Sequence, residues 1–393
     1  MRILLASDFF PPTPGGMEAH VQRLAEALIL RGHEVAIVTG TAQPDPLPGR
    51  AVIIPTSTVL AQAPHLFRDG ARPFPPPYPD ALFRRSVRRI ASWWRPDVIH
   101  AHGWCAFSCY WPDAPPLVVT LHDHGLRCSK KTLLRDGKEC LTGRGTRCIT
   151  CTGSQPLLKR LPLTIALGHS IAGLVAHTSR FIAVSESVAR RFKELGPATF
   201  AVHIVPNFLE VGVEALSTPA SPPIVLFVGP DAPHKGRSIA IDAFRRLPPG
   251  PAQLHLVGSN TSVGGAGITT LGYMRSAELL EQYQRASVLV APAVWPEPCP
   301  TVVLEAMAQG LPAIGSRIGG IPDLVEHERS GLLVTPNDSV ALADSLRRVL
   351  TDHPLRQRLG IGARARSEQF DTSAVVPRIE TIYASACRIR VPI

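Results

Sequence analysis

The chain of 393 residues is poor in charge and has no long uninterrupted apolar run. Charged residues make up 18% and hydrophobic residues 45%, which excludes a disordered polyelectrolyte. The 31 glycines and 39 prolines follow no period, so a collagen-like chain is excluded too. The first apolar run ends before Asp8, too early for a secretory signal. A later apolar stretch, residues 161–175, contains His169 and is too short to span a bilayer.

Acidic residues are scarce in the first half only. Residues 1–205 hold 24 Lys and Arg against 14 Asp and Glu, and residues 206–393 hold 17 of each, so the first half carries the whole net charge of +10. Such a surface is expected to face an anionic partner. Without a targeting or spanning segment, the expected location is the cytoplasm, with the inner face of the membrane as an option.

The first forty residues have the order strand, glycine-rich loop, helix, strand. The helix MEAHVQRLAEALILRG carries Val21, Leu24, Leu28 and Leu30 at helical spacing. This βαβ order predicts an α/β fold with a parallel sheet. Further strands are predicted at residues 96–103, 115–124, 180–185 and 200–205.

A second alternating series starts after a boundary near residues 206–218. Its predicted strands are 222–229, 253–258, 287–293 and 312–316, and its predicted helices are 237–247, 276–284 and 301–309. We therefore expect two doubly wound, Rossmann-like domains that face each other across a cleft. They are residues 1–205, with a cysteine-rich insertion at 125–155, and residues 206–372, followed by a helix at 373–393 that crosses back to the first domain.

Ligands of such sheets bind at the carboxyl ends of the strands. The loops expected there are 11–16, 122–124, 229–236, 294–300 and 316–320. Glu297 and Glu305 stand out in this set, with seven residues between them. Glu297 precedes a predicted helix and Glu305 lies in its first turns, so backbone amides at the helix start could hold an anion between two carboxylates that bind hydroxyls. A ribose and a sugar joined by a diphosphate would suit this pattern.

The motifs resemble, in order and over nearly the whole chain, those of a family 4 glycosyltransferase. They are DFFPPTPGGMEAHVQRLAEALILRGHEV, PDVIHAHG, VVTLHDH, FIAVSESVARRF, IVPNF, FVGPDAPHKG and the block around Glu297 and Glu305. The resemblance implies the GT-B fold and retaining transfer of a hexose-type sugar from a nucleoside-diphosphate sugar. The acceptor is left open between a glycan, a lipid-linked intermediate and a small molecule.

The resemblance also assigns donor-binding residues in the second half. Glu297 matches the glutamate that contacts the donor sugar, and Glu305 matches the one that holds the ribose. Residues 299–301, which are Cys299, Pro300 and Thr301, stand where the family uses backbone amides on the donor. Pro300 has no N–H to donate, so one of those bonds is absent.

Lys235 matches the family's phosphate-binding lysine. Its charge would stabilise the leaving diphosphate. The family's arginine after the preceding strand is replaced by Pro230, and Arg237 is a neighbour that could substitute for it. In the first half, Gly15 and Gly16 match the loop that lets the backbone approach the diphosphate without a Cβ.

His122 matches the family histidine near the donor sugar, and with Glu297 and Lys235 it forms the predicted catalytic set. His102 and His124 are the next candidates, whereas His100 is expected to point into the core. The family mechanism is front-face attack, in which the leaving phosphate takes the acceptor proton. It needs no metal cofactor, and the chain has no D-x-D motif.

Three other functions fit parts of the sequence. A nucleotide-sugar epimerase would use the same donor cleft, but the pair Glu297 and Glu305 favours a transferase. A nicotinamide dehydrogenase is disfavoured because no strand leads into G-x-G-x-x-G. A non-catalytic sugar-nucleotide binder would be consistent with the changes at Pro230 and Pro300.

Four cysteines gather within 24 residues as C-x11-C-x7-C-x2-C: Cys128, Cys140, Cys148 and Cys151. In a reducing compartment this predicts a structural zinc site, with thiols or disulfides as alternatives. A second feature is the helix at residues 80–97, in which Arg84, Arg85, Arg88 and Arg95 lie largely off the apolar stripe of Phe83, Val87, Ile90 and Trp94, and Trp93 is adjacent to Trp94. It is expected to pack as a surface helix or to contact anionic lipid. No nucleic-acid motif is present.

Overall fold

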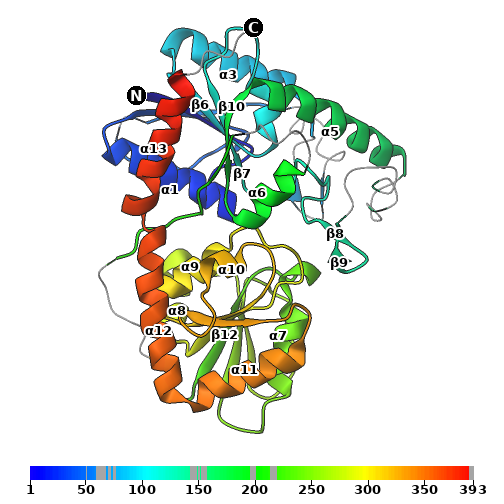
Figure 1. Cartoon of the computed structure of the whole chain (residues 1–393), viewed down its shortest axis with the longest axis vertical. Coiled ribbons are helices and arrows are strands. Elements are labelled where there is room, and N and C mark those ends of the chain that lie inside the picture. The colour runs from blue at the N-terminus through cyan, green and yellow to red at the C-terminus, as the bar shows by residue number, and fades with distance from the viewer. Residues whose placement is uncertain are drawn as a thin grey trace. The chain divides into compact units, whose positions relative to one another are not determined.

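The chain forms two compact units, each built around a parallel sheet (Figure 1). The computed structural model describes residues 1–49, 51–58, 68–69, 72–73, 77–141, 148, 151, 157–194, 201–212 and 219–388. The first unit comprises Met1–Leu133, Cys140–Pro206 and Val375–Ile393, and the second comprises Leu134–Glu139 and Asn207–Ala374.

The first unit contains a seven-stranded sheet of order β11-β10-β7-β6-β1-β2-β3, in which all neighbours run parallel. The strands are β1 (Arg2–Ser7), β2 (Glu34–Thr39), β3 (Val52–Pro55), β6 (Val98–His102), β7 (Leu117–Leu121), β10 (Thr178–Ala183) and β11 (Val202–Ile204). The carboxyl ends of β1, β6 and β7 are therefore neighbours. This edge is where a doubly wound sheet binds ligands.

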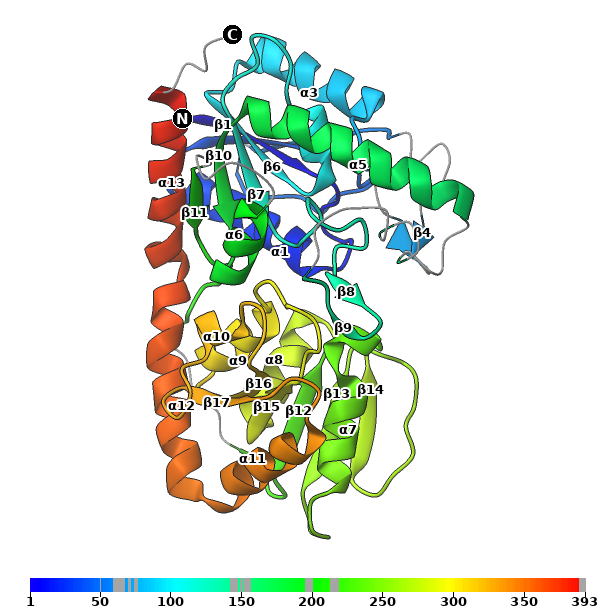
Figure 2. The same ribbon diagram turned by 45° about the vertical axis from the view of Figure 1, so that its right-hand side comes forward.

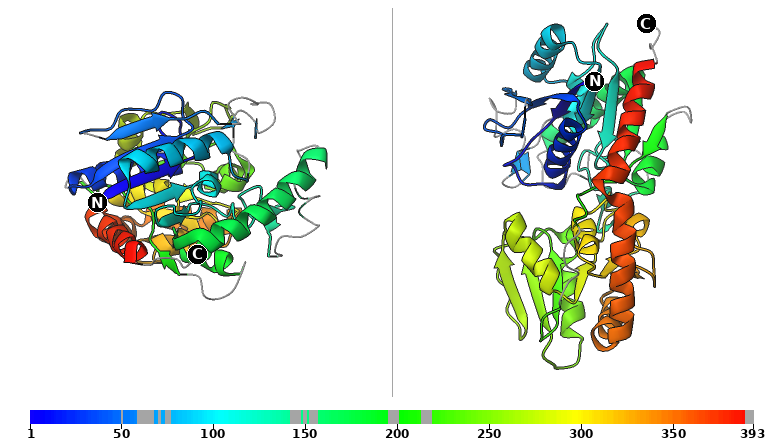
Figure 3. Two further views of the ribbon diagram at one scale, coloured as in Figure 1. Left: turned by 90° about the horizontal axis from the view of Figure 1, so that it is seen from above. Right: turned by 90° about the vertical axis from the view of Figure 1, so that its left-hand side faces the viewer.

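Helices cover both faces of this sheet (Figure 3). They are α1 (Gly16–Leu30), α3 (Ala81–Trp94), the 3-10 helix η1 (Trp104–Ser108), α5 (Leu157–His177), α6 (Glu186–Lys193) and α13 (Thr372–Arg388). In α1 the predicted stripe is correct for Val21, Leu24 and Leu28, which are buried, but wrong for Leu30, which is 86% exposed. Leu30 lies two positions beyond Leu28, so a 3.6-residue period places it on the opposite side.

Two short antiparallel hairpins are also described. One pairs β4 (Arg68–Asp69) with β5 (Arg72–Pro73), and the other pairs β8 (Leu134–Arg135) with β9 (Lys138–Glu139). The second lies inside the predicted cysteine-rich insertion. Residues 142–147, 149–150 and 152–155 of that insertion lie outside the described residues.

The second unit contains a six-stranded parallel sheet of order β14-β13-β12-β15-β16-β17. Its strands are β12 (Ile224–Val228), β13 (Gln253–Val257), β14 (Ile268–Gly272), β15 (Val288–Ala291), β16 (Ala313–Ser316) and β17 (Gly331–Val334). Its helices are η2 (Pro233–Lys235), α7 (Arg237–Arg245), α8 (Ser276–Arg285), α9 (Thr301–Ala308), α10 (Ile321–Leu324), α11 (Ser339–Thr351), α12 (His353–Ser367) and η3 (Glu368–Phe370).

Apolar side chains of α7 and α11 pack on one face of this second sheet, and α8 and α9 lie on the other (Figure 2). The core is aliphatic, with Val225, Leu254, Val288 and Leu346 fully buried. The predicted α/β class with two doubly wound sheets is confirmed. Among the helices of the described residues, none is both long and apolar enough to cross a membrane.

Candidate functional site

The segments that follow β12 and β15 carry the predicted donor residues of the second unit, and the loop after β16 contacts one of them, Glu297. Because these three strands are adjacent and parallel, their carboxyl ends lie side by side in the second unit. Lys235 ends the turn η2 after β12, and Glu297 lies in the loop between β15 and α9. Glu305 lies in the second turn of α9. This is the placement that the sequence predicts for the two glutamates.

The Lys235 ammonium and the Glu297 carboxylate form an ion pair. Lys235 Nζ donates to both carboxylate oxygens of Glu297, at 3.0 Å to Oε1 and 2.8 Å to Oε2. The indole N–H of Trp295 donates to the same Oε2 at 2.6 Å, and Lys235 Nζ lies 5.2 Å from the centre of the Trp295 ring. Glu297 is 8% exposed, so the carboxylate is held at a defined position by charge-assisted hydrogen bonds.

The turn after β16 contacts the backbone of Glu297. The backbone N–H of Gly320 donates to the Glu297 carbonyl at 2.7 Å. Gly319 has φ +63°, and a Cβ on it would lie 2.3 Å from the Glu297 carbonyl oxygen and 2.4 Å from its nitrogen. Only glycine allows this approach, so the sequence Gly319-Gly320 positions Glu297 through its backbone.

Glu305 and the start of α9 follow the loop that carries Glu297. The Tyr283 hydroxyl donates to Glu305 Oε2 at 3.0 Å. Pro300 is the N-cap of α9, so the helix starts without an N–H at that position. Asn207 Nδ2 donates to the Cys299 carbonyl at 2.9 Å, and burial raises the pKa of the Cys299 thiol to about 12. Cys299 is thus a neutral, packed residue, not a nucleophile.

Arg237 does not substitute for the arginine that is missing at Pro230. Its guanidinium is 5% exposed, lies 2.9 Å from Asp231 Oδ2 and donates to the Thr261 carbonyl at 2.6 Å. A guanidinium used in this way stabilises the loops of the second unit and is not directed at a ligand. Lys235 therefore remains the cation that the structure places beside Glu297.

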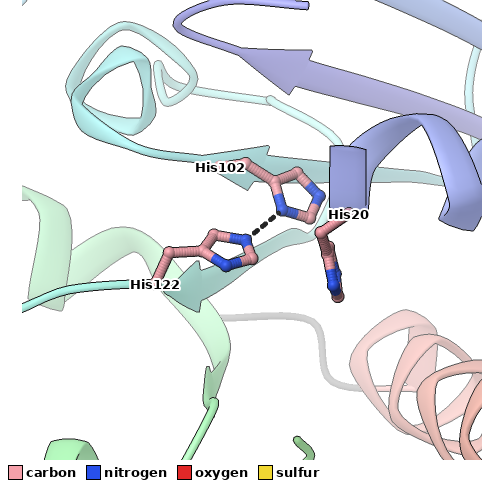
Figure 4. Close-up of side chains that lie close together, drawn as sticks. All are labelled: His20, His102 and His122. Carbon is pink, nitrogen blue, oxygen red and sulfur yellow. Dashed lines mark hydrogen bonds between the residues drawn. The ribbon is translucent and has the colours of Figure 1, made fainter. Parts of the chain in front are cut away.

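The predicted residues of the first unit gather around His122, which directly follows β7. His102, the last residue of β6, places Nδ1 2.9 Å from His122 Nε2. The His20 ring on α1 meets the His122 ring edge-on at 4.7 Å between centres. Figure 4 shows the three rings converging from one helix and two strand ends. His100, two residues before His102, points to the same side of the sheet and is fully buried, as predicted.

Burial keeps His100, His102 and His122 neutral. It lowers the pKa of His122 to about 3, with His100 and then Lys131 adding to the shift, and lowers the pKa of His100 to about 3, with a smaller effect of His20. Burial, and after it the neighbouring rings of His100, His122 and His20, lowers the pKa of His102 well below its usual range. Ligand nitrogens of His20, His102 and His122 lie within 4.8 Å of one another. Among the described residues, this is the group of three or more side chains that could hold a metal ion.

Gly15 and Gly16 lie at the start of α1 and are exposed. Gly15 is the N-cap and Gly16 the first helical residue, so the free amides of a fifteen-residue helix start here. His124 is buried, and its backbone carbonyl accepts the N–H groups of Arg127 and Cys128. His124 thus belongs to a turn, whereas His102 contacts His122 directly.

The predicted site residues therefore fall into two sets. His122, Gly15 and Gly16 belong to the first unit, and Lys235, Glu297, residues 299–301 and Glu305 belong to the second. Sequence reasoning missed Trp295, Tyr283 and His20, each of which contacts a predicted residue. For His20 a pattern was available, because it lies four residues before the buried Leu24 on the inner face of α1.

All eight cysteines are in the thiol form, so no disulfide links them. Burial raises the pKa of Cys128, and Cys151 is close enough to contribute to that shift. Among the described residues, Cys128, Cys140, Cys148 and Cys151 do not form a group with ligand atoms within metal-binding distance. The zinc site stays a prediction.

The two parallel, Rossmann-like sheets, one in each unit, define the GT-B fold of glycosyltransferases. Residues 14–212 match the family described as Glycosyltransferase Family 4, and residues 213–366 match Glycosyl transferases group 1. The chain belongs to glycosyltransferase family 4. It is a glycosyltransferase that uses a nucleotide-sugar donor.

Full-length relatives have the same class of activity in their names. A glycogen synthase of Mycobacterium tuberculosis is 28% identical, with 99% of this chain and 95% of the relative covered. A phosphatidyl-myo-inositol mannosyltransferase of Mycobacterium leprae is also 28% identical, with 100% of both chains covered. The solved sucrose-phosphate synthase of Thermosynechococcus elongatus has a TM-score of 0.73 at 21% identity and covers 98% of each chain. The fold is therefore shared over the full chain.

Proposed function

We propose that this enzyme transfers a hexose-type sugar from a nucleoside-diphosphate sugar to its acceptor with retention of anomeric configuration. The observation that carries this proposal is the group formed by Lys235, Glu297 and Trp295. It combines a cation for a diphosphate with a rigidly held carboxylate for sugar hydroxyls. The names of the relatives, among them a mannosyltransferase and a glycogen synthase, support a hexose.

Lys235 would stabilise the leaving group. An ammonium has three N–H groups, and Lys235 uses two of them on Glu297. The third can donate to a phosphate oxygen while Glu297 keeps the side chain in place. Since negative charge grows on the diphosphate as the sugar leaves, this bond strengthens in the transition state.

Glu297 would bind hydroxyls of the sugar, and Glu305 those of the ribose. Neither carboxylate is assigned as a nucleophile in this proposal. The leaving phosphate oxygen takes the proton of the acceptor hydroxyl, the new bond forms on the face that the phosphate leaves, and the configuration is retained. A double displacement would instead need a carboxylate below the anomeric carbon.

The first experiment identifies the donor. Thermal shifts are measured with UDP, GDP, ADP and their common sugars, without added metal, and the sugar nucleotide that raises Tm is then used in a transfer assay. NMR of the product glycoside reads its anomeric configuration. A product of inverted configuration would refute retention, and no shift with any of these nucleotides would refute the donor assignment.

Lys235→Met and Glu297→Gln test the group formed by Lys235, Glu297 and Trp295. Each removes one charge from the ion pair, and we expect kcat to fall by about 10²–10³-fold with Lys235→Met, as for other transition-state donors. Glu328→Gln is the matched control, because Glu328 pairs with Arg348 at 2.9 Å on the exposed surface of the same unit. Equal activity of Lys235→Met and the control would refute the proposed role of Lys235.

A further inference from the structure

His102 and His122 form a direct hydrogen bond between two neutral imidazoles. His102 is fully buried, and its Nδ1 lies 2.9 Å from His122 Nε2. Figure 4 shows that the second nitrogen of His122 is turned away from His102. The remaining nitrogen of His102, Nε2, is buried and has no hydrogen-bond partner among the described residues. These contacts determine which nitrogen carries each proton.

A neutral imidazole has one N–H and one lone pair, so two arrangements of this bond are possible. If His122 donates from Nε2, then His102 Nδ1 accepts, and the proton of His102 sits on the buried Nε2 as a donor without an acceptor. If His102 donates from Nδ1, its buried Nε2 has only an unused lone pair. Buried N–H groups without partners are rarer than under-used acceptors. The second arrangement is therefore the stable one.

We infer that His102 is a positioning residue that holds His122 in the tautomer with its proton on Nδ1. His122 Nε2 is then occupied as an acceptor, and the nitrogen turned away from His102 presents an N–H. His122 offers a neutral hydrogen-bond donor to whatever binds at this strand end. It does not act there as a base, because the lone pair that would take a proton already accepts from His102.

The functional consequence rests on the proposed function, in which His122 lies near the donor sugar. A neutral N–H suits an oxygen acceptor, either a sugar hydroxyl or an oxygen of the leaving phosphate. The opposite tautomer would present a lone pair to the same oxygen and would repel it. The inference thus explains why a second histidine, fully buried and remote from solvent, lies behind the family histidine.

The tautomer is tested directly by NMR of protein labelled with ¹⁵N-histidine. Two-bond ¹H–¹⁵N correlations distinguish a proton on Nδ1 from one on Nε2, and His122→Gln assigns the signals. At pH 7.5 we expect His122 with its proton on Nδ1 in the wild type and in His102→Asn, whose amide N–H can replace the Nδ1 donor. In His102→Asp the carboxylate only accepts, so the proton of His122 should move to Nε2.

Transfer kinetics then connect the tautomer with function. We expect His102→Asn to keep kcat within about 3-fold of wild type and His102→Asp to lose about 10²-fold, the effect of one transition-state donor. His100→Asn is the matched control on the same strand. Its hydrogen bonds go to Tyr383 and Thr120, at 2.7 Å each, so the His122 tautomer should not change.

Three results would overturn the inference. One is a wild-type His122 whose proton lies on Nε2. A second is equal activity of His102→Asp and His102→Asn in proteins of equal Tm. The third is stoichiometric zinc in the purified protein that is lost in His102→Leu, because a metal on these rings would use the lone pair assigned here to the hydrogen bond. Absence of transfer with every donor would refute the proposed function and leave the NMR result standing.

Discussion

At the scale of single residues, Glu297 depends on the backbone around it as much as on its own charge. Gly319 touches the Glu297 backbone at a distance that excludes any side chain. Gly319→Ala would place a methyl group against that backbone and would also force alanine into the left-handed region. Such strain costs about 1–3 kcal/mol. We expect a lower Tm and a higher KM for the donor, because Glu297 is displaced.

Gly264→Ala provides the control for this prediction. Gly264 is in the same unit, and an added Cβ would meet nothing within 4 Å. Its Tm and KM should match those of the wild type. If Gly319→Ala behaved like Gly264→Ala, the turn after β16 would not be what positions Glu297.

The positions of site residues were predictable where a motif carried them, and their contacts were not predictable where the partners come from distant segments. The helix pattern placed Glu305 in α9 and Glu297 before it, and the structure agrees. Trp295 and Tyr283 carry no motif, because their roles arise from one hydrogen bond each to those glutamates. The proton positions of His102 and His122 depend on a contact between two strand ends. The sequence of either strand alone therefore does not predict them.

At the scale of elements, α13 packs on the first unit through buried apolar side chains such as Val376 and Ile379, and polar contacts, both buried and at the surface, add to this attachment. The Tyr383 hydroxyl lies 2.7 Å from His100 Nδ1, and both residues are fully buried. Arg31 lies 2.7 Å from Glu380 at the exposed edge. The buried bond is the stronger of these two polar contacts, because exposed pairs are screened by water.

Tyr383→Phe tests this attachment. It leaves His100 Nδ1 buried without its partner, so we expect a loss of about 1–3 kcal/mol in the free energy of unfolding, measured by urea denaturation. Tyr273→Phe, at a tyrosine that is 70% exposed, should change stability by less than about 0.5 kcal/mol. Equal midpoints for the two variants would mean that α13 does not depend on the Tyr383 hydroxyl.

The zinc site predicted for the four clustered cysteines belongs to the insertion at residues 125–155. We expect about one zinc per chain by elemental analysis of protein purified without chelator, with four thiolates as ligands. The double change Cys148→Ser and Cys151→Ser should remove the zinc, whereas Cys387→Ser, at an exposed cysteine elsewhere, should retain it. Protein without zinc in all three forms would refute the site.

Helix α3 packs on the first unit through one apolar face. Of the predicted apolar stripe, Phe83, Val87 and Ile90 are buried and Trp94 is half-buried, whereas Trp93 is 60% exposed. Arg84 lies over the Tyr110 ring, 5.5 Å from its centre, so one of the basic side chains packs on its own unit. Contact with anionic lipid stays a prediction.

Predicted elements were most accurate where a strand was continuous and apolar. β1, β12 and β15 lie within their predicted ranges. β3, β14 and β17 were missed, because they lie toward or at the edges of their sheets and their short sequences show no period. The helices α11 and α12 were missed as well, although both start after an aspartate N-cap.

At the scale of the whole molecule, each unit has its own sheet and core, so unfolding is not expected to be a single two-state step. His100, His102 and His122, whose pKa values burial lowers, belong to the first unit. Asp371 and Glu328 of the second unit have lowered pKa values. Their contribution is lost only as the pH falls through the acidic range below about 4.5. Mild acid should therefore affect the two units differently.

The lowered pKa of His100 determines in which direction acid changes the stability of the first unit. This pKa is about 3 in the folded protein against about 6.5 for an exposed histidine. Below pH 6.5 the unfolded chain therefore binds a proton that the folded chain does not bind. Its contribution is fully present above pH 6.5 and is lost at about 1.4 kcal/mol per pH unit below it. His102 and His122 act in the same direction. Asp8 acts in the opposite direction, since burial raises the pKa of its carboxyl.

We therefore expect the first unit to melt at a lower temperature at pH 5.5 than at pH 7.5, with the second unit little changed. Calorimetry resolves the two transitions. His100→Asn is expected to be less stable at pH 7.5 because it loses two buried hydrogen bonds. It should also lose about 1.4 kcal/mol less than wild type between the two pH values, because one titrating group is gone. An equal loss in both proteins would show that His100 is not buried in the neutral form.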